Sequence, residues 1–368
     1  MSPELTIILV GAFAGASCAL VGSFLVLRKM ALLGDAISHA VLPGIVLAFL
    51  LTGNRSPIPM VIGAGALGLL TVLLVELFNR SRRLREDASI GVVFPALFSL
   101  GVILISRYAS QVDLDLDCVL YGEIAYAPLD ILTLGGMDLG SKALWVNGLI
   151  LAVNLSFVLA FYKELKISTF DAGLAATLGF SSILLHYLLM SSVSMTVVGA
   201  FESVGAILVV AMLVVPPATA YLLTERLGHM LALAAALGAA SSVGGYGLAR
   251  WLDCSIAGAM ALVSGLLFLT ALLFSPTHGL VARWVIHRRL GGRLEGELLL
   301  LHLTKGGEGL PVSVLERRFG WNGARLQRVL SRLLRQGWIE RAGEGLRLTA
   351  DGARALETSG RSALAHQL

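Results

Sequence analysis

The sequence predicts an all-α polytopic membrane protein with about nine transmembrane helices, followed by a small cytosolic α+β tail. Hydrophobic residues make up 56% of the chain and charged residues 14%, whereas soluble domains carry about 25% charged residues. Of the 28 lysines and arginines, 15 lie from Arg283 onward beside 8 acidic residues, so the first 282 residues have a net charge of −3. These observations predict a membrane domain at 1–282, a cytosolic domain at 290–356 and a flexible end at 357–368.

Nine apolar segments account for the membrane domain, and each is close to the roughly 20 residues that a helix needs to cross a bilayer. They lie at 5–27, 31–51, 57–78, 89–108, 143–162, 182–200, 203–223, 229–249 and 256–275.

Basic residues cluster after the odd-numbered segments, for example at Arg28, Arg80, Lys163 and Arg226. Cytoplasmic loops are enriched in Lys and Arg, so this pattern predicts an N-terminus outside the cell and a C-terminus in the cytoplasm. The sequence therefore predicts a multi-pass protein of the cell (inner) membrane.

The 109–142 loop is then external, with its alternating acidic residues Asp113, Asp115 and Asp117. Cys118 and Cys254 both face the outside, where disulfides form. A bond between them is one interpretation, and two free thiols are the simpler one.

Asp35 and His39 are the most informative residues, because they lie four residues apart inside an apolar segment and share one face of a helix. Ionisable groups within a membrane are costly and usually face a polar pathway, and a carboxylate with an imidazole suits a divalent metal. A structural ion pair is the alternative. Two copies of the chain would supply four ligands around a two-fold axis.

A proline and the depth of His39 in the membrane add to this interpretation of the 31–51 segment. Pro43 has no N–H to donate to the carbonyl of His39. Counting from Arg28, His39 lies roughly 16 Å into the membrane, which is near the middle of the apolar layer. Two other polar residues carry weaker signals: we expect His186 to be a packing or interfacial histidine, and Glu202 to be a solvated outer carboxylate or a guide for cations.

The segment from Lys163 to Gly179 is too polar to span the membrane and too apolar for a simple loop. Its spacing is typical of a short amphipathic helix on the cytoplasmic side, and the residues that set this spacing are Asp171, Leu174, Ala175, Leu178 and Gly179. Such a helix either rests on lipid headgroups or docks a cytosolic partner.

The pattern of the tail that follows Arg289 predicts a winged helix. Leu294–Leu303 and Val312–Phe319 are helix candidates, and Asn322 can cap a third helix. That helix carries an arginine face at Arg325, Arg328, Arg332 and Arg335. A hairpin follows around the turn at 342–345. The arginine face could contact phosphates, a membrane or a protein partner.

No G-x-x-x-x-G-K-[ST] phosphate loop occurs in the chain, so an ATP-driven process needs a separate ATPase subunit. We expect no permanently bound cofactor, with the divalent metal ion as the transported substrate. An ion-coupled secondary metal transporter and a membrane-anchored, metal-responsive transcriptional regulator are the alternatives from other classes.

Three stretches resemble the ABC-importer permeases for zinc, manganese or iron: RKMALLGDAISHAVLPG at 28–44, FDAGLAATLG at 170–179 and LVVAMLVVPPATA at 208–220. The resemblance implies a dimer with a second copy or a sister permease, docked ATPase subunits and an extracytoplasmic metal-binding protein. It places the metal pair at Asp35 and His39 and the coupling helix at Asp171–Gly179.

The tail resembles the winged helix of iron- and manganese-dependent repressors, through 325–337 and the LRLTADG stretch at 346–352. This resemblance favours manganese or iron as the metal. For the arginine face we favour a regulatory or subunit contact over DNA binding.

Overall fold

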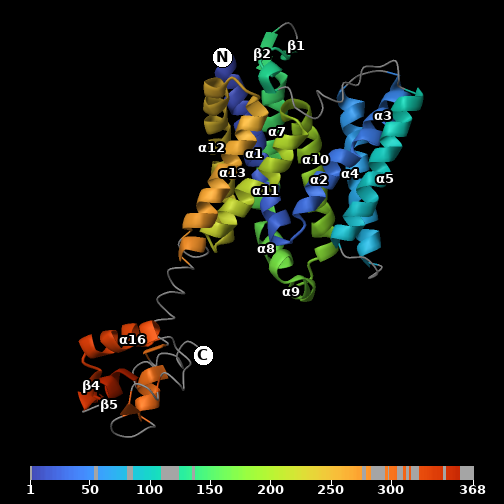
Figure 1. Cartoon of the computed structure of the whole chain (residues 1–368). Coiled ribbons are helices and arrows are strands. Elements are labelled where there is room, and N and C mark those ends of the chain that lie inside the picture. The colour runs from blue at the N-terminus through green and yellow to red at the C-terminus, as the bar shows by residue number, and fades with distance from the viewer. Residues whose placement is uncertain are drawn as a thin grey trace. The chain divides into compact units, whose positions relative to one another are not determined.

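The computed structural model describes residues 2–53, 57–80, 86–108, 124–134, 137–275, 279–282, 295–296, 298–304, 310–311, 315, 323–342 and 345–356. The chain divides into two compact units, unit 1 (Met1–Gly279) and unit 2 (Leu280–Leu368) (Figure 1).

Within the described residues, unit 1 contains nine stretches of helix that are long and apolar enough to cross a membrane. One of these stretches is divided into two helices, α2 and α3. The helices are α1 (Pro3–Leu27), α2 (Ala31–Ala40), α3 (Leu42–Thr52), α4 (Pro57–Arg80), α5 (Glu86–Tyr108), α7 (Lys142–Ala160), α10 (Ser182–Val204), α11 (Ala206–Leu223), α12 (Leu227–Leu252) and α13 (Ile256–Phe274). The prediction of a polytopic helical membrane protein is therefore confirmed.

Helix α1 lies at the centre of the larger group of helices and packs against α7, α10, α11 and α12. Small residues let it approach its neighbours closely, as is common in membrane helices. A Cβ atom added at Gly15 would lie 2.9 Å from the carbonyl oxygen of Gly238 on α12. The side chains of Val10, Cys18, Val21 and Phe24 on this helix are fully buried.

Helices α3, α4 and α5 form a second group in which each helix packs against the other two. Gly44 on α3 and Gly63 on α4 approach so closely that a Cβ atom on either would collide with the other's carbonyl oxygen. Helix α2 lies between the two groups and contacts α4, α5, α10 and α11 (Figure 1). The helix with Asp35 and His39 therefore occupies the junction of the bundle.

The connection between α5 and α7 carries a short 3-10 helix, η1 (Ile124–Tyr126), and an antiparallel hairpin of β1 (Ile131–Leu134) and β2 (Met137–Ser141). This hairpin lies at the same end of unit 1 as the N-terminus (Figure 1). Asp113, Asp115, Asp117 and Cys118 lie outside the described residues. Cys254, in the turn after α12, is an exposed free thiol.

At the opposite end of unit 1, α8 (Tyr162–Phe170) continues from α7 after a bend at Phe161, and α9 (Ala172–Thr177) follows (Figure 1). The sequence predicts one short amphipathic helix here. The structure has two helices because Asp171 adopts an extended conformation and its side chain accepts a hydrogen bond of 2.9 Å from Leu174 N, which starts a new helix.

Unit 2 contains a three-stranded antiparallel sheet in the order β3–β5–β4 and helix α16. The elements are β3 (Leu310–Pro311), α16 (Gly323–Arg335), β4 (Ile339–Ala342) and β5 (Gly345–Leu348). The expected hairpin is present, with Ile339 paired to Leu348. Asn322, residues 357–368 and most of the 312–319 segment lie outside the described residues, so the winged helix stays a prediction.

The core of unit 2 is apolar and separate from that of unit 1. Leu326, Val329 and Leu333 project from one side of α16 and are buried against Ile339 and Leu346 of the hairpin. The helix is strongly amphipathic, as its spacing of leucines and arginines predicts.

Candidate metal pathway

Asp35 and His39 lie together on one face of α2, as their spacing predicts. Nε2 of His39 is 3.5 Å from Oδ1 of Asp35. The Asp35 side chain is 46% exposed and that of His39 is 32% exposed. Both side chains therefore remain open to a ligand or a second chain.

The opposite face of α2 is fully used in packing. Leu33 and Ile37 are completely buried, and a Cβ atom at Gly34 would collide with the side chain of Leu213 on α11. Ser38 is buried and donates a 2.9 Å hydrogen bond to the carbonyl of Gly34. Ser38 therefore faces the packed side of the helix, away from the Asp35–His39 pair.

Two aromatic rings of α5 hold the imidazole of His39. The centroid of Phe94 lies 5.3 Å from that of His39, and Phe98 approaches the ring edge-on at 6.2 Å. Aromatic pairs prefer such tilted or edge-to-face arrangements. The two phenylalanines restrict the orientation of the imidazole, whose side chain remains 32% exposed.

The helical path breaks two residues after His39. Val41 ends α2 and begins α3, and Pro43 occupies the first turn of α3, where its missing N–H is tolerated. The sequence predicts one apolar segment at 31–51 with a perturbed carbonyl at His39. The structure keeps a single span at Ala31–Thr52 and interrupts its hydrogen-bonded helix at Val41, so the pair lies in the last two turns of the ten-residue helix α2.

Two ligands are fewer than a divalent transition metal requires, since such ions take four or more. Among the residues that the structure describes, no group of three or more His, Cys, Asp or Glu side chains gathers to form a complete site. The Asp35–His39 pair can therefore contribute half of a metal shell.

The predicted coupling segment forms a knob at the far end of the bundle. Leu174 and Leu178 of this segment are 49% and 54% exposed, whereas Ala175 is fully buried. Gly179 has a φ of +85°, the left-handed conformation that glycine adopts after a helix. Every residue of the knob from 171 to 180 is thus exposed except Ala175, which is buried against the rest of the bundle.

Helix α16 of unit 2 presents basic side chains opposite its apolar face. Arg328, Arg332 and Arg335 are exposed, and Nε of Arg328 donates to the carbonyl of Ala324 at 3.2 Å. Arg325 belongs to the same helix, but its side chain lies outside the described part of the structure. The arginine face carries at least three positive charges that its own domain leaves exposed to solvent.

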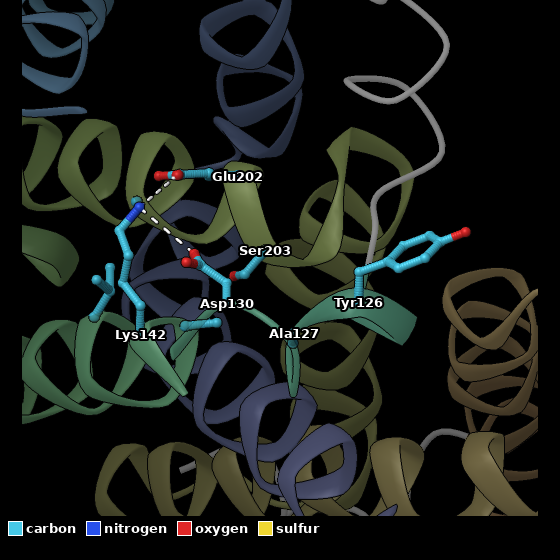
Figure 2. A pocket seen from close by; sticks show the side chains of 9 residues that line it. Tyr126, Ala127, Asp130, Lys142, Glu202 and Ser203 are labelled. Carbon is cyan, nitrogen blue, oxygen red and sulfur yellow. Dashed lines mark hydrogen bonds and ion pairs between the residues drawn. The ribbon is translucent and has the colours of Figure 1, made fainter. Parts of the chain in front are cut away.

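A second polar site lies at the hairpin end of unit 1, and the sequence indicated only Glu202 in it. The Lys142 ammonium lies 2.9 Å from Oε1 of Glu202 and 3.7 Å from Oδ2 of Asp130 (Figure 2). These residues line a cavity of about 160 Å³ together with Tyr126 and Ser203. Lys142 and Glu202 are 60 residues apart, so no local pattern could have paired them.

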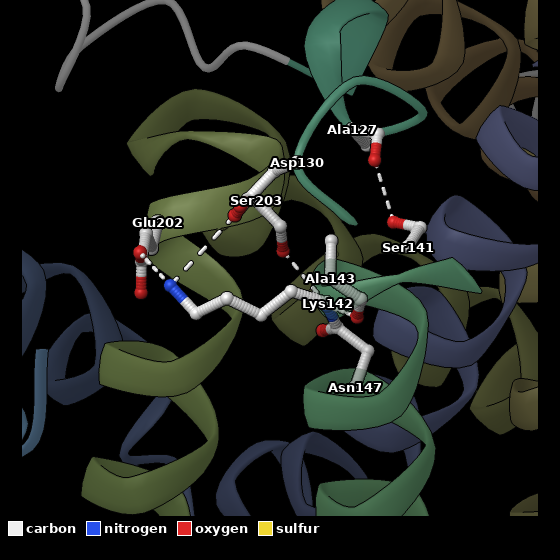
Figure 3. A network of polar contacts seen from close by, with 8 residues as sticks. All are labelled: Ala127, Asp130, Ser141, Lys142, Ala143, Asn147, Glu202 and Ser203. Carbon is white, nitrogen blue, oxygen red and sulfur yellow. Dashed lines mark hydrogen bonds and ion pairs between the residues drawn. The ribbon is translucent and has the colours of Figure 1, made fainter. Parts of the chain in front are cut away.

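Buried hydrogen bonds connect the elements next to this cavity. Nδ2 of Asn147 donates to Oγ of Ser203 at 2.7 Å, and Oγ of Ser141 donates to the carbonyl of Ala127 (Figure 3). These bonds join α7 to α10 and the hairpin to the turn after η1. The hairpin end of unit 1 is therefore held together by polar contacts between its elements.

A sequence model of the ABC 3 transport family matches residues 5–275. The manganese transport system membrane protein MntD of Bacillus subtilis is 51% identical over 283 residues, which cover 77% of this chain and 96% of that protein. The zinc transport system membrane protein TroD of Treponema pallidum is 44% identical over 352 residues, covering 94% of this chain and 96% of that protein.

Among solved structures, PsaBC from Streptococcus pneumoniae in complex with Fab resembles this chain with a TM-score of 0.64 and 31% identity. The likeness covers 78% of this chain and 96% of the compared chain. The similarity therefore extends over essentially all of unit 1.

Proposed function

The chain belongs to the ABC 3 transport family, and on this basis we propose that divalent metal ions cross the membrane along a pathway lined by Asp35 and His39. The chain is a membrane permease subunit of an ABC importer for metals of the manganese, zinc and iron group. It is a transporter component and not an enzyme, and ATP hydrolysis belongs to a separate ATPase subunit. An ion-coupled secondary carrier does not fit this family.

The observation that carries the proposed pathway is the open Asp35–His39 face of α2. The opposite face of the helix is buried, yet this face keeps a carboxylate and an imidazole 3.5 Å apart and partly exposed. A second permease with the same pair would add two ligands and cover the exposed face. Four such ligands match the coordination number of zinc and provide much of the shell of manganese or iron.

The knob formed by α9 supports a docking role at the cytoplasmic end. Leu174 and Leu178 are exposed although they do not lie on a membrane-spanning helix, and neighbouring exposed apolar side chains of this kind are typical of a contact site. The ATPase subunit would bind here. The N-terminus and the β1–β2 hairpin would then face outside, where a metal-binding protein delivers the ion.

The arginine face of α16 fits a regulatory or subunit contact in the cytoplasm. DNA binding is the alternative, and it makes a distinct prediction because contacts to phosphates release counterions. Retardation of duplex DNA by the full-length chain, weakening steeply as salt rises, would favour DNA. If the chain does not bind DNA even at low salt, the DNA alternative is excluded and the contact with a protein partner is retained.

The test of the pathway is metal uptake by Asp35→Asn and His39→Gln variants, reconstituted in liposomes with the ATPase and the binding protein. We expect each change to lower manganese or zinc uptake at least tenfold, because each removes a ligand from both halves of the shell. Asp253→Asn is the matched control, since Asp253 lies in an exposed turn far from α2. Uptake by both pathway variants at the level of the control would overturn the proposal.

A further inference from the structure

Arg28 occupies the tight turn that joins α1 to the helix with the metal pair. Its backbone N–H donates to the carbonyl of Phe24, and Met30 N donates to Leu25 O at 2.9 Å. Lys29 between them adopts a φ of +63°, which is uncommon for a residue with a side chain. The start of α2 is therefore fixed by a short, defined turn.

The guanidinium group of Arg28 makes three hydrogen bonds to two other elements. Nε lies 3.2 Å from Oγ1 of Thr169, Nη2 lies 3.1 Å from Oγ of Ser168, and Nη1 lies 3.3 Å from Nδ1 of His186. The two hydroxyl groups belong to the last turn of α8, and His186 belongs to α10. Burial lowers the pKa of Arg28, yet arginine keeps its charge where lysine loses it.

His186 continues the chain of contacts to a third element. A guanidinium group can only donate, so Nδ1 of His186 accepts, and the proton of a neutral imidazole lies on Nε2. Nε2 is 3.9 Å from Oε2 of Glu76 on α4. A cavity of about 190 Å³ next to this pair is lined by Met30 and Leu33 at the start of α2.

We propose that Arg28 is a positioning residue that transmits movement of the ATPase-docking knob to the metal pair. Thr169 lies two residues before Asp171, the cap of α9, and Arg28 lies three residues before the first residue of α2. The side chain of Arg28 thus bridges the end of the element that carries the knob and the beginning of the element that carries Asp35. This inference rests on the proposed docking role of α9.

The lengths of these bonds limit how far α8 can move without a change at Arg28. They measure 3.1–3.3 Å, and a contact of about 3.6 Å is no longer a hydrogen bond. A displacement of α8 by about 1 Å therefore either moves the Arg28 turn with it or breaks the bonds, and each outcome changes what holds the start of α2. The turn is short, so a displacement of Arg28 reaches α2 within three residues.

The experiment compares hydrolysis by the complete transporter with and without metal-loaded binding protein. Arg28→Gln should lower the ratio of stimulated to basal hydrolysis roughly tenfold, which lies within the usual range of coupling between sites. Arg28→Lys should keep only part of the stimulation, because a lysine cannot reach all three acceptors at once. The control is Arg250→Gln, which removes one exposed ion pair with Glu4 at the other end of the bundle.

A second variant separates positioning from folding. Ser168→Ala combined with Thr169→Val leaves Arg28 in place but removes its two acceptors on α8. This double variant should lose stimulation as Arg28→Gln does, and adding Arg28→Gln to it should lower the ratio no further. Normal stimulation in the double variant would overturn the proposal, even if Arg28→Gln itself assembles poorly.

The outcomes also distinguish this inference from the proposed function. If Leu174→Arg on the knob leaves ATPase binding unchanged, the docking role fails whatever Arg28 does. If docking is confirmed while Arg28→Gln keeps full stimulation, the Arg28 inference alone fails.

Discussion

At the scale of single residues, Asn154 shows how polar groups are accommodated inside the bundle. Nδ2 of Asn154 on α7 donates to Oγ of Ser17 at 2.7 Å and to Oγ1 of Thr196 at 2.6 Å, and its Oδ1 accepts from Ser192. Asn154, Ser17 and Thr196 are buried. A satisfied network of this kind fixes the register of α1, α7 and α10, because any slip would leave its members unpaired.

We therefore expect Asn154→Ala to destabilise the permease by ~1–2 kcal/mol, the range for buried hydrogen bonds between membrane helices. Thermal denaturation of the purified protein, followed by loss of soluble monodisperse complex, measures this effect. Ser156→Ala is the control on the same helix, since Ser156 is exposed and donates to Ala152 O within that helix. Equal midpoints for the two variants would show that the network contributes nothing to stability.

The sequence could predict contacts between residues that are close in the chain, but not contacts between residues that are far apart in it. Asp35 and His39 could be paired from their spacing, because a helix places residues four apart on one face. Arg28 and His186 are 158 residues apart, so their contact follows from helix packing that no single pattern reveals. His186, expected to be a packing or interfacial histidine, lies between helices and contacts Arg28 and Glu76.

At the scale of elements, α9 makes the sharpest prediction. Leu174→Arg should weaken ATPase binding at least tenfold, because an exposed leucine in a contact is replaced by a long charged side chain. Co-purification with the ATPase at graded concentrations measures the loss. Leu174 is 49% exposed and lies outside the membrane-spanning helices, so insertion of the permease should be normal.

The matched control places the same change at the other end of the bundle. Leu129 is 74% exposed in the turn after η1, and Leu129→Arg should leave ATPase binding intact. A loss of the same size in both variants would indicate a general defect and would remove the support for docking at α9.

The sequence could predict the number of helical stretches and most of their bounds, because apolar length is the dominant signal in a membrane helix. It could not predict the break between α2 and α3, because a proline is compatible with a kinked continuous helix. Nor could it predict the two helices at 162–177, where the decisive feature is the side-chain cap at Asp171.

At the scale of the whole molecule, the two units differ in how widely they match relatives. The alignment with MntD covers 283 residues and nearly all of that protein, a length close to that of unit 1 alone. The alignment with TroD covers 352 residues, which exceeds unit 1 and so includes much of unit 2. The tail is therefore not peculiar to this chain, and a permease of this family exists without it.

One metal ion shared by two α2 helices is the central feature of the proposed pathway. The most direct measurement is the metal content of the purified transporter, combined with X-ray absorption of the bound manganese or zinc. We predict one ion for every two permease chains, with imidazole nitrogen and carboxylate oxygen in its shell, and loss of the nitrogen signal in His39→Gln. One ion per chain, or a nitrogen signal that persists in His39→Gln, would contradict the account.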